Sequence, residues 1–218
     1  MPGSPKPLSI IPVPGIPEIN PGDDLVRILS RAAGEAGISI EEGDVVVFAQ
    51  KVVSKAEGRI VDLNEVEPSP FAYSVAKNFG KDPRLVEVIL SETTKVIRMD
   101  RRKPDKGRLI VETRGGIISA NAGVDASNVS GGDRVTLLPV DSDESAKKLA
   151  EGIKRIFGVE TAVIITDTVG RPWRDGLVDI AIGCYGIKAL RDLRGGRDAK
   201  GLVLIATVMA DADELASA

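Results

Sequence analysis

The sequence contains no histidine, a single cysteine and neither of the two common glycine-rich nucleotide-binding fingerprints. Without histidine there is no imidazole general base, no Ser-His or Cys-His nucleophile pair and no imidazole-based zinc site. A lone cysteine, Cys184, excludes an intramolecular disulfide, and its apolar neighbours favour a buried small side chain. No two glycines are spaced Gly-x-Gly, and no P-loop motif is present. Catalysis must therefore use carboxylates, lysine, arginine, hydroxyls, backbone amides or a bound cation.

Aromatic residues and long apolar runs are also scarce. Aromatics make up 3% of the 218 residues, so Val, Ile, Leu and Ala must build the core. No apolar run approaches the ~20 residues that span a bilayer. Residues 1–8 lack a signal-peptide apolar region and are interpreted as a flexible lead-in, and the single cysteine favours the reducing cytoplasm. The 29 basic and 32 acidic residues leave a net charge of −3, which argues against nucleic-acid binding.

Local patterns predict most of the secondary structure. Ser69-Pro70 and Asp82-Pro83 each combine an N-cap with a first-turn proline, and Asp23-Asp24 precede an amphipathic pattern. The prolines of residues 10–17 allow only an edge strand or an extended loop. Further helices are expected over residues 142–157 and from 211, and strands over 44–49, 95–99, 108–113, 116–120, 161–166, 179–184 and 202–208. This irregular order predicts an α+β fold with a mixed β-sheet and a helical lobe at about residues 69–92.

Polar residues without an obvious packing role occur in two segments. Asp125 lies in residues 121–128, and Asp167 and Thr168 follow the apolar run 162–165, where we expect a buried strand to end. Strand ends are where rigid scaffolds present functional groups, and carboxylate and hydroxyl oxygens suit a hard divalent cation. The alternative is that Asp and Asn simply terminate strands in turns. The two segments together slightly favour a site for metal and phosphate.

Basic residues recur at regular spacing after the predicted strand 44–49. Lys51, Lys55 and Arg59 are four residues apart, which indicates either a solvated basic helix face or a cluster of cations for phosphate. Arg171 and Arg174 flank Trp173, a proposed packing anchor. They suit a clamp for phosphate or carboxylate, or an arginine stacked on the indole in a surface turn. Residues 191–198, rich in Arg and Gly, favour a flexible solvated loop.

Three longer runs, taken together, resemble the coenzyme F-420 glutamate ligases. They are KVVSKAEGR at residues 51–59, NAGVDASN at 121–128 and ITDTVGR at 165–171. Shorter matches occur in the same order at residues 15–17, 21–24, 137–141 and 181–183. The resemblance covers nearly the whole chain and implies the fold of that family for a ligase domain over residues 9–218. It also implies a homodimer.

The resemblance further implies the reaction and its ligands. These ligases add L-glutamate to the deazaflavin coenzyme precursor through a γ-glutamyl amide, using GTP and Mg²⁺ or Mn²⁺, with K⁺ as a candidate further ion. Asp125 and Asp167 are implied ligands of one divalent cation and Thr168 of a second, and Lys55 is an implied catalytic contact to GTP. The remaining residues implied in nucleotide binding are Pro14, Gly15, Ile16, Pro17, Gln50, Lys51 and Asn128.

Three interpretations of the function follow. The first is GTP-dependent ligation through an acyl phosphate. The second is a glutamate ligase of the same family with a folate-like acceptor, and the third is a nucleotide- or metal-binding module without catalysis. The family's chains are expected to continue past the helix that begins near Asp211 with a Gly-rich stretch that contributes to GTP binding. We expect the nucleotide site to be incomplete without that stretch.

Overall fold

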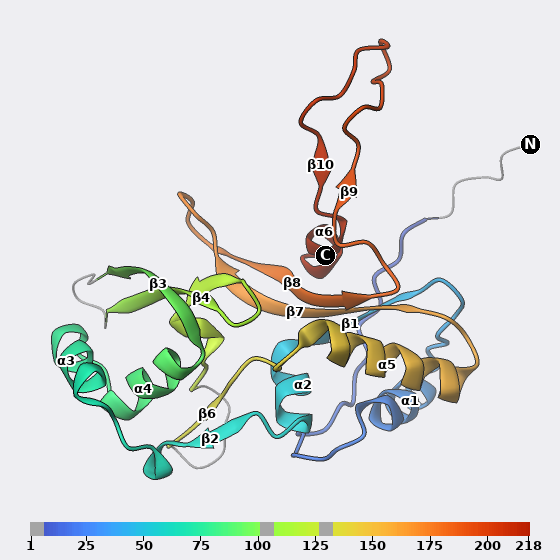
Figure 1. The fold of residues 1–218 in the computed structure, drawn as a ribbon. Helices are drawn as coiled ribbons and strands as arrows, with labels where there is room; N and C mark the ends of the chain where they lie inside the picture. The colour runs from blue at the N-terminus through green and yellow to red at the C-terminus, as the bar shows by residue number, and fades with distance from the viewer. Residues whose placement is uncertain (1–6, 101–106, 127–132) are drawn as a thin grey trace, which may run out of the picture.

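The central sheet contains three strands, and several smaller sheets surround it in a mixed α/β arrangement (Figure 1). The computed structural model describes residues 7–100, 107–126 and 133–218. In the central sheet, β1 (Val45–Ala49) runs parallel to β7 (Ala162–Gly170), and β8 (Leu177–Tyr185) returns antiparallel beside β7. The β1 ladder ends where Ala49 pairs with Thr166, so the rest of β7 is paired only with β8.

Helices cover both faces of this sheet. On one face, α1 (Leu25–Glu35), α2 (Gln50–Ala56) and α5 (Ser142–Phe157) share a core with alternate residues of β7 such as Val163 and Ile165. On the other face, α6 (Asp211–Ala216) packs Ala212 and Ala216 against Ile164. The short α6 is therefore ordered by packing on the body, because a helix of this length is marginal in isolation.

The ends of the helices are set by their own sequence. Asp24 and Asp141 cap α1 and α5 by accepting hydrogen bonds from first-turn amides, and Ser69 and Asp82 do the same before first-turn prolines. Gly158 ends α5 with a φ of 77°, a conformation that glycine adopts without steric cost. These signals are local, and the predicted starts of all four helices are confirmed.

A second group of elements lies beside the central sheet. The helices α3 (Pro70–Phe79) and α4 (Pro83–Ser91) pack on each other and on a three-stranded sheet of β3 (Thr93–Asp100), β4 (Arg108–Thr113) and β5 (Ile118–Ala120). A ribbon of β2 (Ile60–Asp62) and β6 (Arg134–Thr136) continues from α2, and Leu63 in the turn η1 (Leu63–Glu65) joins its core. The mixed α/β class is as expected, whereas a separate helical lobe at 69–92 stays a prediction.

The pair β9 (Arg191–Asp192) and β10 (Val208–Met209) forms the base of an arm that projects away from the body (Figure 1). Residues 191–198 were interpreted as a solvated loop, and this part of the arm is indeed exposed. The strand expected over residues 202–208 is wrong, because only its last residue enters β10 and the rest has no long ladder partner. Residues 10–17 form an extended loop rather than an edge strand.

One prediction about the central sheet needs correction. The buried strand was expected to end before Asp167, but β7 continues through Asp167 and Thr168 to Gly170 because β8 pairs with it over that whole length. The short strands β2 and β6 were not expected at all. In the described residues, no helix is long and apolar enough to cross a membrane.

Candidate metal and nucleotide site

A lysine and a carboxylate meet at the end of β1. Lys51 lies in the first turn of α2, and Asp125 follows the turn η2 (Asn121–Gly123). The Lys51 Nζ atom is 2.6 Å from Asp125 Oδ2, and each side chain is about one-third exposed. Reciprocal hydrogen bonds with Thr136, of 3.0 and 2.8 Å, fix the backbone of Asp125. The carboxylate is therefore held by strand-like pairing and not by a free turn.

The backbone before Asp125 has an unusual conformation. Asn121 and Ala122 have φ values of 55° and 56°, in the left-handed region that costs a non-glycine residue roughly 1–2 kcal/mol. A Cβ atom at Gly123 would lie 2.7 Å from the side chain of Leu138, so only glycine fits there. Such strain is stored mostly at functional sites, and here it directs the chain toward Lys51.

Asp167 lies on the same face of the sheet as Lys51. Its neighbour Ile165, two residues earlier, packs in the core with α1 and α5, and side chains two apart on a strand share a face. Burial raises the pKa of Asp167 above its ordinary value, a hydrogen bond from the backbone of Thr168 opposes this, and the charges of Asp125 and Lys51 act on it in opposite directions. The structure thus brings together Asp125, Asp167 and Lys51.

Thr168 lies on the opposite face of β7, because adjacent strand residues alternate. Its hydroxyl donates a 2.5 Å hydrogen bond to Asp179 Oδ1 on β8. The side chains of Thr168 and Asp167 therefore point to opposite faces of the sheet, and their roles as ligands of two different cations stay a prediction. The sequence reasoning missed Asp179. The β7–β8 hairpin register pairs it with Thr168, and that register was the only signal that would have revealed it.

Lys55 is buried beside the N-terminal extended segment. Its side chain is 10% exposed, and its Nζ atom is 2.5 Å from Glu18 Oε1. Glu18 directly follows the Pro14–Pro17 segment, so Lys55 lies next to that segment, and a nucleotide site shared by the two stays a prediction. Gly15 in this segment has a φ of 78°, and the four residues of the segment are exposed.

Two other residues, Gln50 and Asn128, were predicted to contact the nucleotide, and the structure describes only the first of them. The side chain of Gln50 is 2% exposed and donates to Ser54 Oγ at 2.7 Å and to the carbonyl of Leu137 at 3.1 Å. Its amide nitrogen therefore joins α2 to the segment after β6, and only its other atoms remain for a ligand. Asn128 lies outside the described residues.

The cations at positions 51, 55 and 59 do not form one helix face. The helix α2 ends at Ala56, and Arg59 instead pairs with Glu92 at 2.8 Å and donates to the carbonyl of Leu138 at 2.9 Å. Each cation has its own acidic partner, so a uniformly solvated basic stripe is wrong. Lys51 and Lys55 both remain beside the candidate site.

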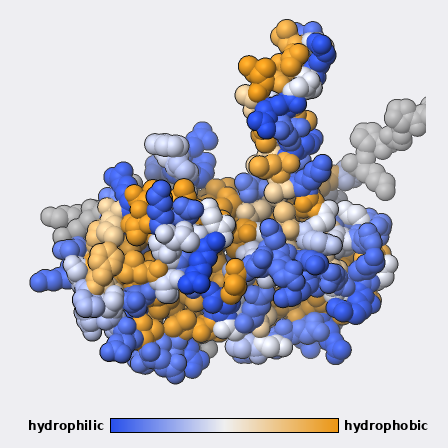
Figure 2. Space-filling model, viewed as in Figure 1, coloured by the Kyte–Doolittle hydropathy of each residue, from blue (hydrophilic) through white to orange (hydrophobic). Residues whose placement is uncertain are grey.

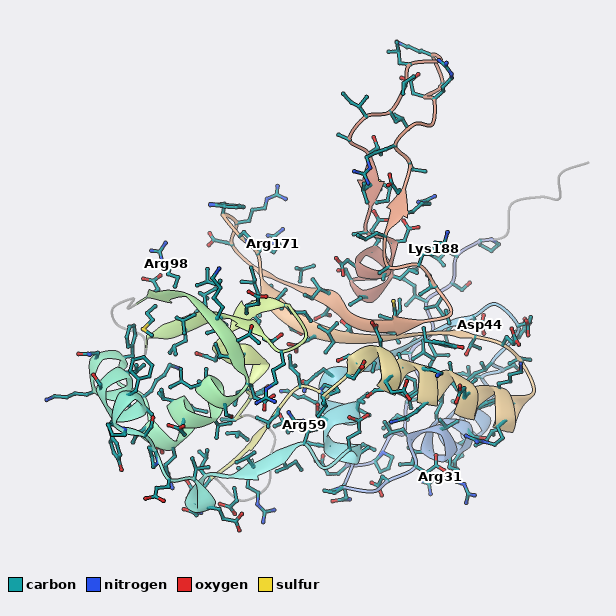
Figure 3. The ribbon with its side chains drawn as sticks, in the orientation of Figure 1. Arg31, Asp44, Arg59, Arg98, Arg171 and Lys188 are labelled. Carbon is teal, nitrogen blue, oxygen red and sulfur yellow. The ribbon has the colours of Figure 1, made fainter. Side chains whose placement is uncertain are left out.

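The arginines after β7 lie at the tip of a hairpin. Arg171 donates to the carbonyl of Asp175, and Figure 3 shows its side chain on the hairpin tip, away from the body. Trp173 is fully exposed and has a φ of 57°. The indole is therefore neither a packing anchor nor covered by a stacked arginine within this chain.

The carboxylates of Asp125 and Asp167 suit a divalent cation bound together with phosphate. Within residues 7–100, 107–126 and 133–218, no three His, Cys, Asp or Glu side chains converge on one metal position. Mg²⁺ commonly takes one or two carboxylates and completes its shell with water and substrate phosphate oxygens. Asp167 is half-buried and burial raises its pKa, so a cation beside this carboxylate would favour its charged form.

Comparison with known proteins adds an independent finding. A family profile described as F420-0:Gamma-glutamyl ligase matches residues 15–218. A protein named Coenzyme F420:L-glutamate ligase from Methanopyrus kandleri is 48% identical over 211 residues, which cover 97% of this chain and 79% of that protein. Proteins with the same name from Methanothermobacter thermautotrophicus and Archaeoglobus fulgidus are 44% and 41% identical, over 97% and 96% of this chain and 81% and 80% of theirs.

Proposed function

Because the chain belongs to the F420-0:gamma-glutamyl ligase family, we propose that it is a coenzyme F420:L-glutamate ligase, which joins L-glutamate to the deazaflavin coenzyme precursor. The structural observation that supports this most is the meeting of Asp125, Asp167 and Lys51 from three distant parts of the chain. Such convergence of opposite charges at one edge of a sheet suits a reaction of phosphates.

A divalent cation, Mg²⁺ or Mn²⁺, would be held by the carboxylates of Asp125 and Asp167, and Thr168 would contribute to a second site. When bound, such an ion neutralises phosphate charge during transfer. Lys51, 2.6 Å from Asp125, would orient this carboxylate. Asp179 would orient the Thr168 hydroxyl through their 2.5 Å hydrogen bond.

GTP would bind along α2 and the N-terminal segment. Lys55 is fixed by Glu18 next to the Pro14–Pro17 segment, so its ammonium can reach a phosphate without first being ordered. The proposed reaction transfers the terminal phosphoryl group of GTP to the acceptor carboxylate, giving GDP and an acyl phosphate. The glutamate amine then attacks the acyl carbon, and inorganic phosphate leaves as the amide forms.

One incubation tests this function. The purified protein is mixed with GTP, Mn²⁺, L-glutamate and the unglutamylated deazaflavin precursor, and products are read by mass spectrometry. We expect an adduct of one or more glutamyl units, with GDP formed in matching amount. GTP binding without turnover would favour a non-catalytic module. A parallel incubation replaces the precursor by a folate-like acceptor, and ligation there alone would favour that acceptor.

We also propose that the protein is a homodimer that uses the β9–β10 arm. Large apolar side chains along the arm are exposed, among them Leu190, Leu202 and Ile205 at 60%, 66% and 85%. Figure 2 shows hydrophobic surface on the arm. Exposed apolar surface that projects in this way is characteristic of protein interfaces, since burying it stabilises an assembly by roughly 25 cal/mol per Å².

Sedimentation velocity tests the dimer. We expect a species of twice the 23.0 kDa chain mass, and a shift toward monomer in Ile205→Ser. The matched control is Leu8→Ser, which removes an equally apolar residue that is 78% exposed but lies in the N-terminal segment. A monomer across the micromolar range, or equal effects of the two substitutions, would contradict this use of the arm.

A further inference from the structure

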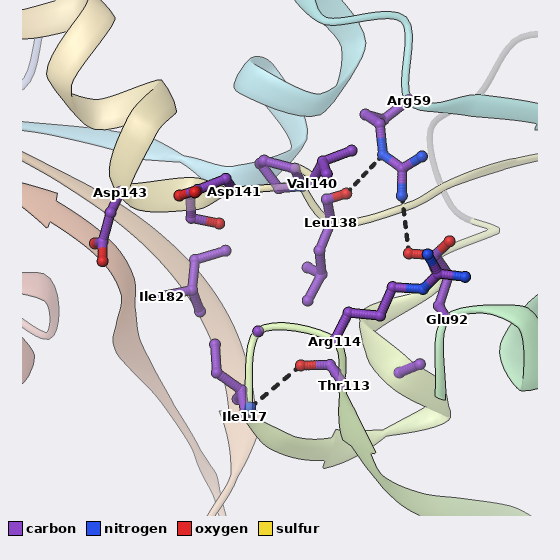
Figure 4. Close-up of a pocket in the computed structure, with 14 residues that line it drawn as sticks. Arg59, Glu92, Thr113, Arg114, Ile117, Leu138, Val140, Asp141, Asp143 and Ile182 are labelled. Atoms are coloured by element: carbon purple, nitrogen blue, oxygen red, sulfur yellow. Dashed lines mark hydrogen bonds and ion pairs between the residues drawn. The ribbon is translucent and has the colours of Figure 1, made fainter. Parts of the chain in front are cut away.

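A cleft of about 300 Å³ opens between the N-terminus of α5, the bulge of β8 and the β4–β5 loop (Figure 4). Its walls include apolar side chains such as Ile117, Leu138 and Ile182. Figure 4 shows charged side chains gathered at opposite ends of it: Asp141 and Asp143 at one, and Arg59, Glu92 and Arg114 at the other. The cleft thus carries negative charge at one end and net positive charge at the other, with apolar walls between them.

The basic end is held in place by bonds to the protein. Arg59 uses Nε and Nη2 for the Leu138 carbonyl and for Glu92, and Arg114 uses Nε and Nη2 for the carbonyl of Ser91, at 3.2 and 2.8 Å. Among the described residues, Nη1 of each guanidinium makes no further hydrogen bond. Glu92 already balances Arg59, so Arg114 supplies the net positive charge and has N–H donors left for a carboxylate.

The acidic end is equally constrained. Asp141 caps α5 by accepting from the Glu144 amide at 2.9 Å, and Asp143 accepts from the Cys184 amide at 2.7 Å. Each bond uses Oδ1, so each carboxylate keeps a second oxygen as acceptor. Two fixed carboxylates beside an apolar wall suit an ammonium group.

The cleft adjoins the candidate metal site. Ile182 is the extra residue in β8 between the Ile165–Gly183 and Thr166–Ala181 pairs, and it packs with the core on the face that Asp167 shares. A bulge of this kind re-aims a side chain, here into the cleft. On the other side, Ala122 lines the cleft three residues before Asp125. A ligand in the cleft therefore lies near the candidate metal site.

We propose that this cleft binds the α-amino acid co-substrate, L-glutamate, with a carboxylate on Arg114 and the ammonium group between Asp141 and Asp143. This inference rests on the proposed function. L-glutamate carries an ammonium group and, at the far end of its side chain, a second carboxylate, so it can offer opposite charges to the two ends of the cleft. The acceptor and GTP lack an ammonium group, so the two aspartates select for the amine that must react.

Charge-only substitutions test the proposal. Asp143→Asn keeps an oxygen to accept from the Cys184 amide but removes the charge, and Arg114→Gln removes the cation on the other side. We expect each to raise KM for L-glutamate by about tenfold or more, with KM for GTP within about twofold, because a charged hydrogen bond is lost at one ligand only. Arg114→Lys should restore part of the affinity. The matched control is Arg98→Gln, an exposed arginine of β3 that does not line the cleft (Figure 3).

Direct binding separates this inference from the proposed function. Calorimetry compares L-glutamate with glutarate, which has both carboxylates but no ammonium group. The wild-type protein should prefer L-glutamate, and Asp143→Asn should reduce that preference about tenfold. An unchanged preference and an unchanged KM for glutamate in both variants would overturn the cleft assignment even if ligation proceeds. Failure of the wild-type protein to ligate glutamate, with binding intact in the cleft, would instead refute the proposed function.

Discussion

Residues 162–165 and 166–170 belong to the same strand, β7, yet they have different surroundings. The first half is paired on both sides, by β1 and β8, and Val163, Ile164 and Ile165 are fully buried. The second half loses its β1 neighbour after Thr166 and carries Asp167 and Thr168 into partly open surroundings. One strand thus provides core residues in its first half and candidate site residues in its second half. The boundary between the halves is the point where β1 ends. Substitutions in the two halves should have opposite consequences for stability and activity.

The largest effect is expected in the second half. Asp167→Asn, and likewise Asp125→Asn, should abolish ligation and weaken Mn²⁺ binding by at least the roughly 10- to 100-fold that loss of an outer-shell partner costs. Calorimetric Mn²⁺ titration measures this. Asp44→Asn is the matched control because this carboxylate lies just before the opposite end of β1 and accepts from the Glu41 amide. Unchanged Mn²⁺ affinity in both variants would remove the two carboxylates from the site.

Asp167→Asn should at the same time leave the metal-free protein as stable as the wild type, or more so, at neutral pH. Burial raises the pKa of Asp167 in the folded state, so the folded protein binds its proton more tightly than the unfolded chain. The wild type therefore loses stability as pH rises through that raised pKa, and the asparagine variant does not. Urea unfolding across acidic and neutral pH measures the difference, and a clear destabilisation at neutral pH would count against this description.

The first half should respond in the opposite way. Ile164→Ala removes a fully buried side chain that contacts Ala212 and Ala216 of α6, and should lower the free energy of unfolding by about 2–5 kcal/mol. Its register partner on β1, Val47, is 42% exposed, and Val47→Ala should cost less than about 1 kcal/mol. Urea unfolding compares them. Folded Ile164→Ala should keep its Mn²⁺ affinity, and loss of that affinity would break the division of β7.

A smaller effect is expected at Lys55, in the helix α2 that follows β1. Lys55→Ala should raise KM for GTP about tenfold, equivalent to roughly 1.4 kcal/mol, while KM for glutamate changes little. Glu18→Gln is the control, because it breaks the 2.5 Å ion pair but keeps the ammonium group. Steady-state kinetics with each substrate varied decides. A defect confined to glutamate would place Lys55 near the amino acid instead.

The smallest effect concerns Cys184, which pairs with Ile164 in the first half of β7. Burial raises the pKa of its thiol, and the nearby charge of Asp143 adds to this. The folded protein should therefore react with iodoacetamide more slowly than the urea-unfolded chain at pH 7–8, and the difference should shrink as pH rises. Mass spectrometry of the alkylated fraction measures the rates. Equal rates would mean that Cys184 is not protected by the sheet.

Much of the local structure was predictable because its causes are local. The caps at Ser69, Asp82 and Asp141 specify helices through bonds to the next few amides. By contrast, β2 and β6 have three residues each, and strands this short exist only because each pairs with the other. The strand expected at 202–208 failed for the same reason: β-prone residues without a ladder partner do not form a strand.

The candidate site, too, was predicted only in part. Residue type and local sequence pointed to Asp125, Asp167 and the two lysines, since carboxylates and cations near strand ends are typical of metal and phosphate sites. Glu18 and Asp179 were not predicted as partners of Lys55 and Thr168, because the first contact spans 37 residues and the second depends on hairpin register. The cleft between Arg114 and Asp143 was not predicted either, because residues from separate parts of the sequence line it.

The sequence by itself determined the family, the starts of most helices and the kinds of chemistry available to a chain without histidine. These follow from side-chain identity and from interactions within a few residues. Only the tertiary structure decided that β7 continues past its buried half, that Asp167 and Thr168 face opposite sides, and that opposite charges line one cleft. These features depend on which distant strands pair and in what register. A shift of one residue in register would turn every side chain of the strand to the other face of the sheet.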